Sequence, residues 1–78
     1  MASRQQNEKT FGTWEQLPGR GRRYIREYAG RAGGRALYIK EVDAAEVTVR
    51  FAQEIYDREG RLVSVHEKFP VDLGHRDV

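Results

Sequence analysis

The chain has 78 residues, of which 33% are charged, with a net charge of +2 and no cysteine. A chain of this length forms one domain with a modest core, and the lack of cysteine excludes disulfides, thiolate zinc sites and thiol catalysis. No stretch approaches the roughly 18 apolar residues that cross a bilayer, and the start MASRQQNEKTFG has no apolar core. We therefore expect a cytoplasmic protein with neither a signal peptide nor a membrane partner.

The positive charge is concentrated in one segment of the chain. Residues 19–35 contain six arginines against one glutamate, a net charge of +5. Residues 36–78 contain six bases and nine acids, a net charge of −3. A local excess of one sign indicates either an anionic partner or ion pairs with oppositely charged neighbours in the fold. Both interpretations fit the composition equally well.

Residues 1–18 are predicted to be a flexible N-terminal arm, because most of them are polar and lack periodicity. The sequence TWEQ at 13–16 has the form of a capping box, which would start one helical turn that Pro18 stops. Trp14 would then dock the arm onto the single small domain that we predict for residues 19–78.

Two strands are predicted on either side of a glycine-rich turn. RRYIREYA at 22–29 has mixed polarity, with tyrosines and arginines recurring on alternate positions. RALYIKEVD at 35–43 places Leu37 and Ile39 on the same face. The sequence GRAGGR between the two segments predicts a turn or a flexible loop.

The stretch DAAEVTVRFAQEIYDREG at 43–60 fits both a helix and a strand. For a helix, AAE favours a first turn, and apolar residues from Val47 to Ile55 repeat at helical spacing. For strands, VTVRF is rich in branched and aromatic residues, and DREG makes a tight turn into the alternating segment RLVSVHEKF. We favour strands, which makes residues 22–69 a four-stranded antiparallel meander in a mainly β fold. The alternative is an α+β fold with a helix at about 43–57.

The second half of the chain resembles an uncharacterised family of short bacterial proteins. The residues that carry the resemblance are YIKEVD at 38–43, VRFAQEIYDREGRLV at 49–63 and HEKFPVDLGH at 66–75. The resemblance extends from Ala36 onward and implies a β-hairpin around 57–60, with no activity attached to it. The hairpin pattern YD-x-x-G-x-L-V and the histidine-containing tail after it are also similar to small toxin components of toxin–antitoxin systems.

The arginine-rich segment supplies the candidate nucleic-acid-binding residues. Guanidinium groups bind phosphate oxygens in pairs and also stack, and tyrosine rings stack on bases. The candidates are Arg20, Arg22, Arg23, Arg26, Arg31, Arg35, Tyr24 and Tyr28. RNA or DNA is then the expected partner. The alternative is that these side chains are solvated strand and loop residues, some of them paired with acids at 41–59.

Two histidines and a neighbouring carboxylate supply the candidate catalytic residues, His66, Glu67 and His75. A ribonuclease needs a base for the ribose 2′-hydroxyl, an acid for the leaving oxygen and cations for the phosphate. The histidines with Glu67 would transfer the protons. However, His66 and Glu67 are adjacent on a predicted strand and therefore point to opposite faces. These residues and Asp72 match no metal-ligand spacing, so we predict no metal and no cofactor.

The sequence therefore predicts a small, non-enzymatic binding module that contacts RNA or DNA phosphates through the arginine-rich segment. A small ribonuclease of the toxin kind is the first alternative. A protein-interaction domain without catalysis, such as a homodimer that shares sheet faces or edges, is the second.

Overall fold

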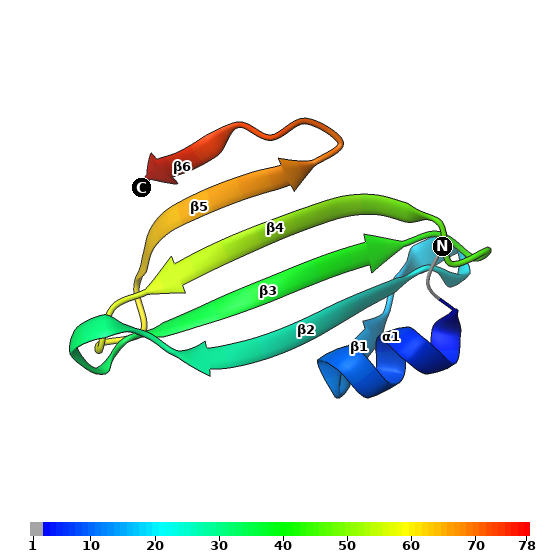
Figure 1. Cartoon of the computed structure of the whole chain (residues 1–78), viewed down its shortest axis with the longest axis horizontal. Coiled ribbons are helices and arrows are strands. Elements are labelled where there is room, and N and C mark those ends of the chain that lie inside the picture. Colours follow the sequence, from blue (N-terminus) through cyan, green and yellow to red (C-terminus); the bar gives the residue numbers. More distant parts are fainter. Residues whose placement is uncertain (1–2) are drawn as a thin grey trace.

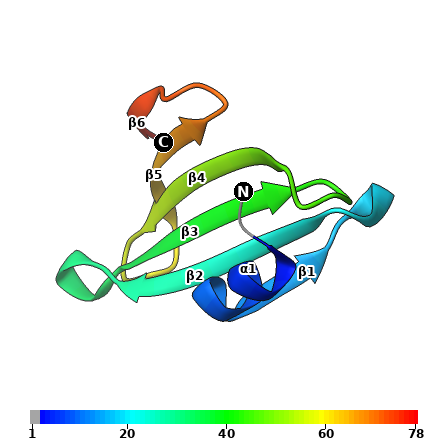
Figure 2. The ribbon, with the colours of Figure 1, turned by 45° about the vertical axis from the view of Figure 1, so that its right-hand side comes forward.

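The computed structural model describes residues 3–78, which form one antiparallel sheet of six strands and a short helix (Figure 1). The strands are β1 (Thr13–Gln16), β2 (Arg22–Ala29), β3 (Arg35–Val42), β4 (Thr48–Tyr56), β5 (Leu62–Phe69) and β6 (Gly74–Asp77). They lie across the sheet in chain order, so each pair of neighbours is an antiparallel hairpin. The helix α1 (Arg4–Phe11) lies against β1 and β2 (Figure 2). Within the described residues, no helix is long and apolar enough to cross a membrane.

The mainly β, antiparallel architecture is confirmed, but the predicted count of four strands is wrong. The two additional strands, β1 and β6, are the edges of the sheet. All four residues of β1 are exposed, and the sequence of β6, GHRD, contains no apolar residue. Short polar strands are typical of sheet edges, where no second neighbour has to be paired. They therefore lack the apolar alternation by which the inner strands were predicted.

Of the segment predicted as a flexible arm, the described residues contain α1 and β1 instead, and residues 1–2 lie outside the described residues. The Ser3 hydroxyl accepts a hydrogen bond from the Gln6 backbone N–H, and the Gln6 side chain accepts one from the Ser3 N–H. This reciprocal pair is a capping box, which satisfies two N–H groups at the start of the helix. Gly12, with a φ of 79°, ends the helix in the left-handed region. The capping box predicted at 13–16 does not form, because TWEQ is strand β1.

A buried polar cluster attaches α1 to the sheet. Asn7 is 2% exposed; its side chain donates to Glu46 and accepts from Lys40, both at 2.9 Å. The Tyr24 hydroxyl also donates to Glu46 at 2.9 Å. Burial raises the pKa of Glu46, but hydrogen bonds from Asn7, Tyr24 and Arg4 outweigh it and hold that pKa below its ordinary value. The helix is therefore fixed to one face of the sheet by hydrogen bonds as well as by packing.

Residues 48–56 form strand β4, which pairs with β3 along its length and excludes the helix predicted as the alternative at 43–57. The spacing of four between its apolar residues fits a helix, but in a strand every fourth residue also returns to the same face. The turn that follows is the predicted hairpin. The Asp57 carboxylate accepts from the backbone N–H groups of Glu59 and Arg61, and Gly60 has a φ of 84°.

Side chains are buried on both faces of the sheet. Tyr24, Ala36 and Val42 are buried on the face that carries α1, which we call the helix face; Ile39 and Ala52 are buried on the other, which we call the opposite face. The strand alternation and the register assign each residue to its face. Tyr24, predicted as a base-stacking residue, is therefore part of the core.

Candidate nucleic-acid interface

Three of the six arginines predicted to bind phosphate are paired with carboxylates. The pairs are Arg22 with Glu8 at 2.6 Å, Arg23 with Glu15 at 2.6 Å and with Glu41 at 2.8 Å, and Arg35 with Glu27 at 3.5 Å. The contact with Glu8 raises the pKa of Arg22. The Arg35 pair is exposed on both sides and contributes little to stability. The segment therefore forms several intramolecular ion pairs. Of their acidic partners, Glu41 lies in the range 41–59 that the alternative interpretation predicted, whereas Glu8, Glu15 and Glu27 lie earlier in the chain.

Arg20 and Arg31 lie in the turns at the two ends of β2, and both are exposed. A strand of this length spans about 26 Å at about 3.3 Å per residue, so these two arginines do not share a site. They are candidates for separate, peripheral phosphate contacts.

A ladder of alternating charges crosses five strands on the opposite face. Its members are Glu15 on β1, Arg23 on β2, Glu41 on β3, Arg50 on β4 and Glu67 on β5. Successive N–O distances are 2.6, 2.8, 3.4 and 2.6 Å. The hydrogen bonds from Arg50 hold the pKa of Glu67 below its ordinary value. Glu67, predicted as a catalytic residue, is thus an ion-pair partner that faces away from His66.

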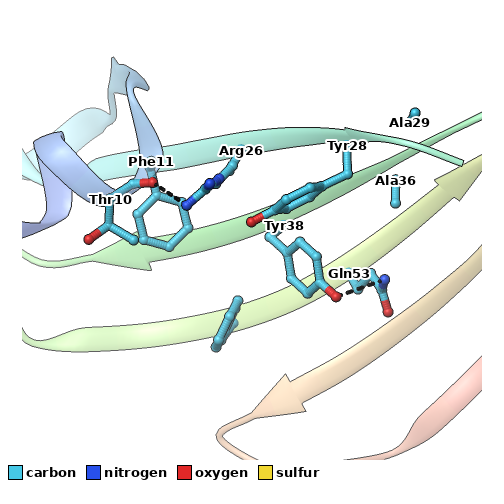
Figure 3. Close-up of a pocket in the computed structure, with 9 residues that line it drawn as sticks. Thr10, Phe11, Arg26, Tyr28, Ala29, Ala36, Tyr38 and Gln53 are labelled. Carbon is cyan, nitrogen blue, oxygen red and sulfur yellow. Dashed lines mark hydrogen bonds between the residues drawn. The ribbon is translucent and has the colours of Figure 1, made fainter.

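Arg26 and Tyr28 are placed differently, because they line a groove on the helix face (Figure 3). The groove has a volume of about 490 Å³, and its walls come from the end of α1 and from β2, β3 and β4. Its aromatic rings are Phe11, Tyr28, Tyr38 and Phe51. Among the described residues that line the groove, none is acidic.

The rings of the groove form a row across three neighbouring strands. Tyr28 on β2 meets Tyr38 on β3 edge to face, with centroids 5.4 Å apart and an interplanar angle of 88°. Tyr38 meets Phe51 on β4 at 6.3 Å. Tyr28 is 42% exposed, so part of its ring is open to solvent. Gln53 on β4 donates a hydrogen bond to the Tyr38 hydroxyl at 3.2 Å (Figure 3).

Two cations flank this aromatic row. The guanidinium carbon of Arg26 lies 5.0 Å from the centroid of Tyr28, and its Nη1 donates to the Thr10 carbonyl at 3.0 Å. The ammonium of Lys68 lies 5.2 Å from the centroid of Tyr38 and 5.9 Å from that of Phe51. In the part of the chain that the structure describes, neither cation has a carboxylate within salt-bridge distance. Both cations therefore have aromatic rings as their neighbours.

The histidines lie on the same face, next to the groove. Arg26, Tyr38, Gln53, His66 and His75 are successive cross-strand partners from β2 to β6. The rings of His66 and His75 are 4.6 Å apart. His66 Nε2 lies 2.5 Å from a carboxylate oxygen of Asp72, and His75 Nδ1 lies 3.1 Å from the hydroxyl of Ser64. The two candidate catalytic histidines are thus brought together, whereas Glu67 is not.

Asp72 is held in place from a second side. The oxygen that contacts His66 also accepts a hydrogen bond from the Gly74 backbone N–H at 3.0 Å. The hydrogen bonds with His66 and Gly74 hold the pKa of Asp72 below its ordinary value. Among the described residues, no three His, Asp or Glu side chains are arranged to bind a metal ion.

Three residues of this face were not predicted as site residues from the sequence: Phe51, Gln53 and Lys68. Alternation within each strand assigns them to a face, but only the register across β3, β4 and β5 brings them together.

Comparisons of the chain with protein-family models, with curated proteins and with solved structures found no match. The resemblance to short bacterial proteins and to toxin components therefore stays a prediction.

Proposed function

We propose that the protein binds single-stranded nucleic acid on the helix face. Bases stack on the rings of the groove, and phosphates contact Arg26 and Lys68. The observation that carries the proposal is the row of Tyr28, Tyr38 and Phe51, flanked by two cations that form no ion pair with a carboxylate among residues 3–78. A positively charged groove with aromatic platforms is the usual arrangement for binding single strands.

The arrangement favours a single strand over a duplex. In a duplex the bases stack on one another, and their faces are closed to protein side chains. Aromatic rings on the surface of a sheet contribute only when bases are unstacked, and each stacked base contributes about 1–3 kcal/mol. Tyr28 is the most exposed of the four rings that line the groove, so we expect it to contribute most directly to stacking.

The charge around the groove favours an anion. Arg26 uses one N–H group on the Thr10 carbonyl, and a guanidinium has five N–H donors in all. Lys68 lies against the faces of two rings, and its charge is not neutralised by an ion pair among the described residues. A phosphate at either side would therefore find donors that are already positioned. Of the eight residues predicted from the arginine-rich segment, this proposal retains Arg26 and Tyr28 at its centre.

The test is an anisotropy titration of labelled single-stranded RNA, single-stranded DNA and a duplex at about 50 and 200 mM salt. We expect both single strands to bind more tightly than the duplex, with an affinity that falls as salt rises. Tyr28→Ala weakens binding by about 1–3 kcal/mol, whereas the matched variant Tyr28→Phe, which keeps the ring, binds like the unchanged protein. Equal loss in both variants, or no binding at low salt, contradicts the proposal.

A further inference from the structure

We propose that the helix face also cleaves bound RNA, with His66 as the general base and His75 as the general acid. The inference rests on the proposed function, because it needs a nucleic-acid strand lying across the same face. The histidines belong to the row of cross-strand partners that contains Tyr38 and Gln53 of the groove. Neighbouring strands are about 4.8 Å apart, so His66 lies about 10 Å across the sheet from Tyr38. A strand bound by the groove would reach the histidines within a nucleotide or two.

The hydrogen bonds around His66 assign it the role of base. Asp72 accepts from Nε2–H, which fixes the tautomer in which Nδ1 carries the lone pair. Gly74 in turn fixes the same carboxylate oxygen. The His66 side chain is 18% exposed, so it is partly open to solvent on the helix face. Asp72 is therefore a positioning residue that acts through the imidazole.

The hydrogen bond of His75 suits the role of acid. When His75 is protonated, Nδ1–H donates to the Ser64 hydroxyl oxygen, and Nε2–H is left to donate to a substrate. The ring lies 4.6 Å from that of His66, so both imidazoles reach the same phosphodiester. Lys68 lies two residues from His66 along β5 and supplies a positive charge on the same face. A base and an acid thus lie side by side, with a cation on the same face of the sheet.

The reaction needs no further reactant. Nδ1 of His66 takes the proton of a ribose 2′-hydroxyl, and the 2′-oxygen attacks the adjacent phosphorus to form the O2′–P bond. The P–O5′ bond breaks, and the leaving 5′-oxygen takes the proton of His75 Nε2. The products are a 2′,3′-cyclic phosphate and a 5′-hydroxyl end. His66 is left protonated and His75 neutral, and exchange with water restores both. DNA, which lacks the 2′-hydroxyl, is bound without being cleaved.

The test uses the full chain with a labelled single-stranded RNA, the DNA of the same sequence, and EDTA, followed by a denaturing gel. We expect RNA to be cleaved to fragments ending in 2′,3′-cyclic phosphate while DNA stays intact. His66→Ala and His75→Ala each lower the cleavage rate by about 100-fold or more. Both variants bind the DNA within about twofold of the unchanged protein, which also shows that they are folded. His66→Gln serves as a second variant if His66→Ala fails to fold.

Arg76→Ala is the matched control, because Arg76 follows His75 on β6 and points to the opposite face. It is expected to cleave RNA at the unchanged rate. RNA that binds but remains intact overturns this inference and leaves the proposed binding function standing. If neither polymer binds and no RNA is cleaved, both proposals fail. Cleavage that persists in both histidine variants also overturns the inference, because other groups then carry it.

Discussion

The two faces of the sheet use the same kinds of residue for different purposes. On the opposite face, Arg23 and Arg50 alternate with three carboxylates in a ladder in which every cation has an acid partner. On the helix face, Arg26 and Lys68 lie against aromatic rings instead. Arg23 and Arg26 belong to the same strand, so their difference comes from side-chain alternation and from the cross-strand neighbour that each one meets. Arginine content alone does not identify a binding surface; the partner of each arginine does.

The largest effect is expected from breaking the ladder at Arg50. Arg50→Ala leaves Glu41 and Glu67 without the cation that lies between them. Hydrogen bonds to charged groups contribute about 1.5–3 kcal/mol, so we expect the free energy of unfolding to fall by about 2 kcal/mol. Urea denaturation measures the change, and binding of single-stranded DNA to the folded variant should be unchanged. Arg61→Ala, at a position whose side chain is 75% exposed, is the control and should cost less than about 0.5 kcal/mol. Equal losses in the two variants would mean that the ladder does not stabilise the fold.

Lowering the pH should reduce the stability of the fold, because it protonates carboxylates that form ion pairs and hydrogen bonds. The pKa of Glu67 is lowered by Arg50, and that of Glu46 lies below its ordinary value. A carboxyl with a depressed pKa in the folded state contributes stability above its unfolded pKa, about 4.3 for glutamate, and loses it as pH falls through the folded value. Urea midpoints should therefore decrease below about pH 4. Glu67→Gln is expected to be less stable at pH 7 and to lose less stability on acidification. Parallel pH curves for the two proteins would contradict the role of Glu67.

The smallest effect is expected from Lys68. Lys68→Ala removes one cation from the helix face, so the slope of log affinity against log salt for a single strand should decrease by about 0.7. Arg61→Ala removes the same charge at the distant β4–β5 turn and should leave the slope unchanged. The measurement is the salt dependence of anisotropy titrations. A decrease of the same size in both variants would show that binding follows net charge and not the groove.

The inner strands could be predicted from the sequence, because their alternation of apolar and polar residues is a local property. The edge strands β1 and β6 could not, since exposed polar segments of four residues carry no such signal. For the site, Arg26 and Tyr28 were within reach of sequence reasoning. Lys68 was not. Alternation places it on the same face as His66, but its position over Tyr38 and Phe51 depends on the register with β4, in which Ala52 pairs with Glu67 and Phe51 with Phe69, so that Lys68 is the extra residue of a bulge. Bulges re-aim side chains, and their position depends on tertiary pairing.

The burial of Tyr24 could not be predicted from the sequence either. Its cross-strand partners are Lys40 on β3 and Trp14 on the unpredicted edge strand β1. Trp14 and the docked helix α1, with Asn7 and Glu46 around the hydroxyl, close it off from solvent. The pairing of Arg22 with Glu8 depends on the same helix. A segment read as a flexible arm therefore removed two of the predicted binding residues from the surface.

The most direct test of the account compares Arg26→Ala with Arg23→Ala, two losses of the same charge from the same strand. Single-stranded DNA is titrated at low salt against each variant, and urea denaturation is measured alongside. We expect Arg26→Ala to weaken binding with little change in stability. We expect Arg23→Ala to lower stability while the folded protein binds as before. Equal weakening of binding by both variants would contradict the assignment of binding to the helix face.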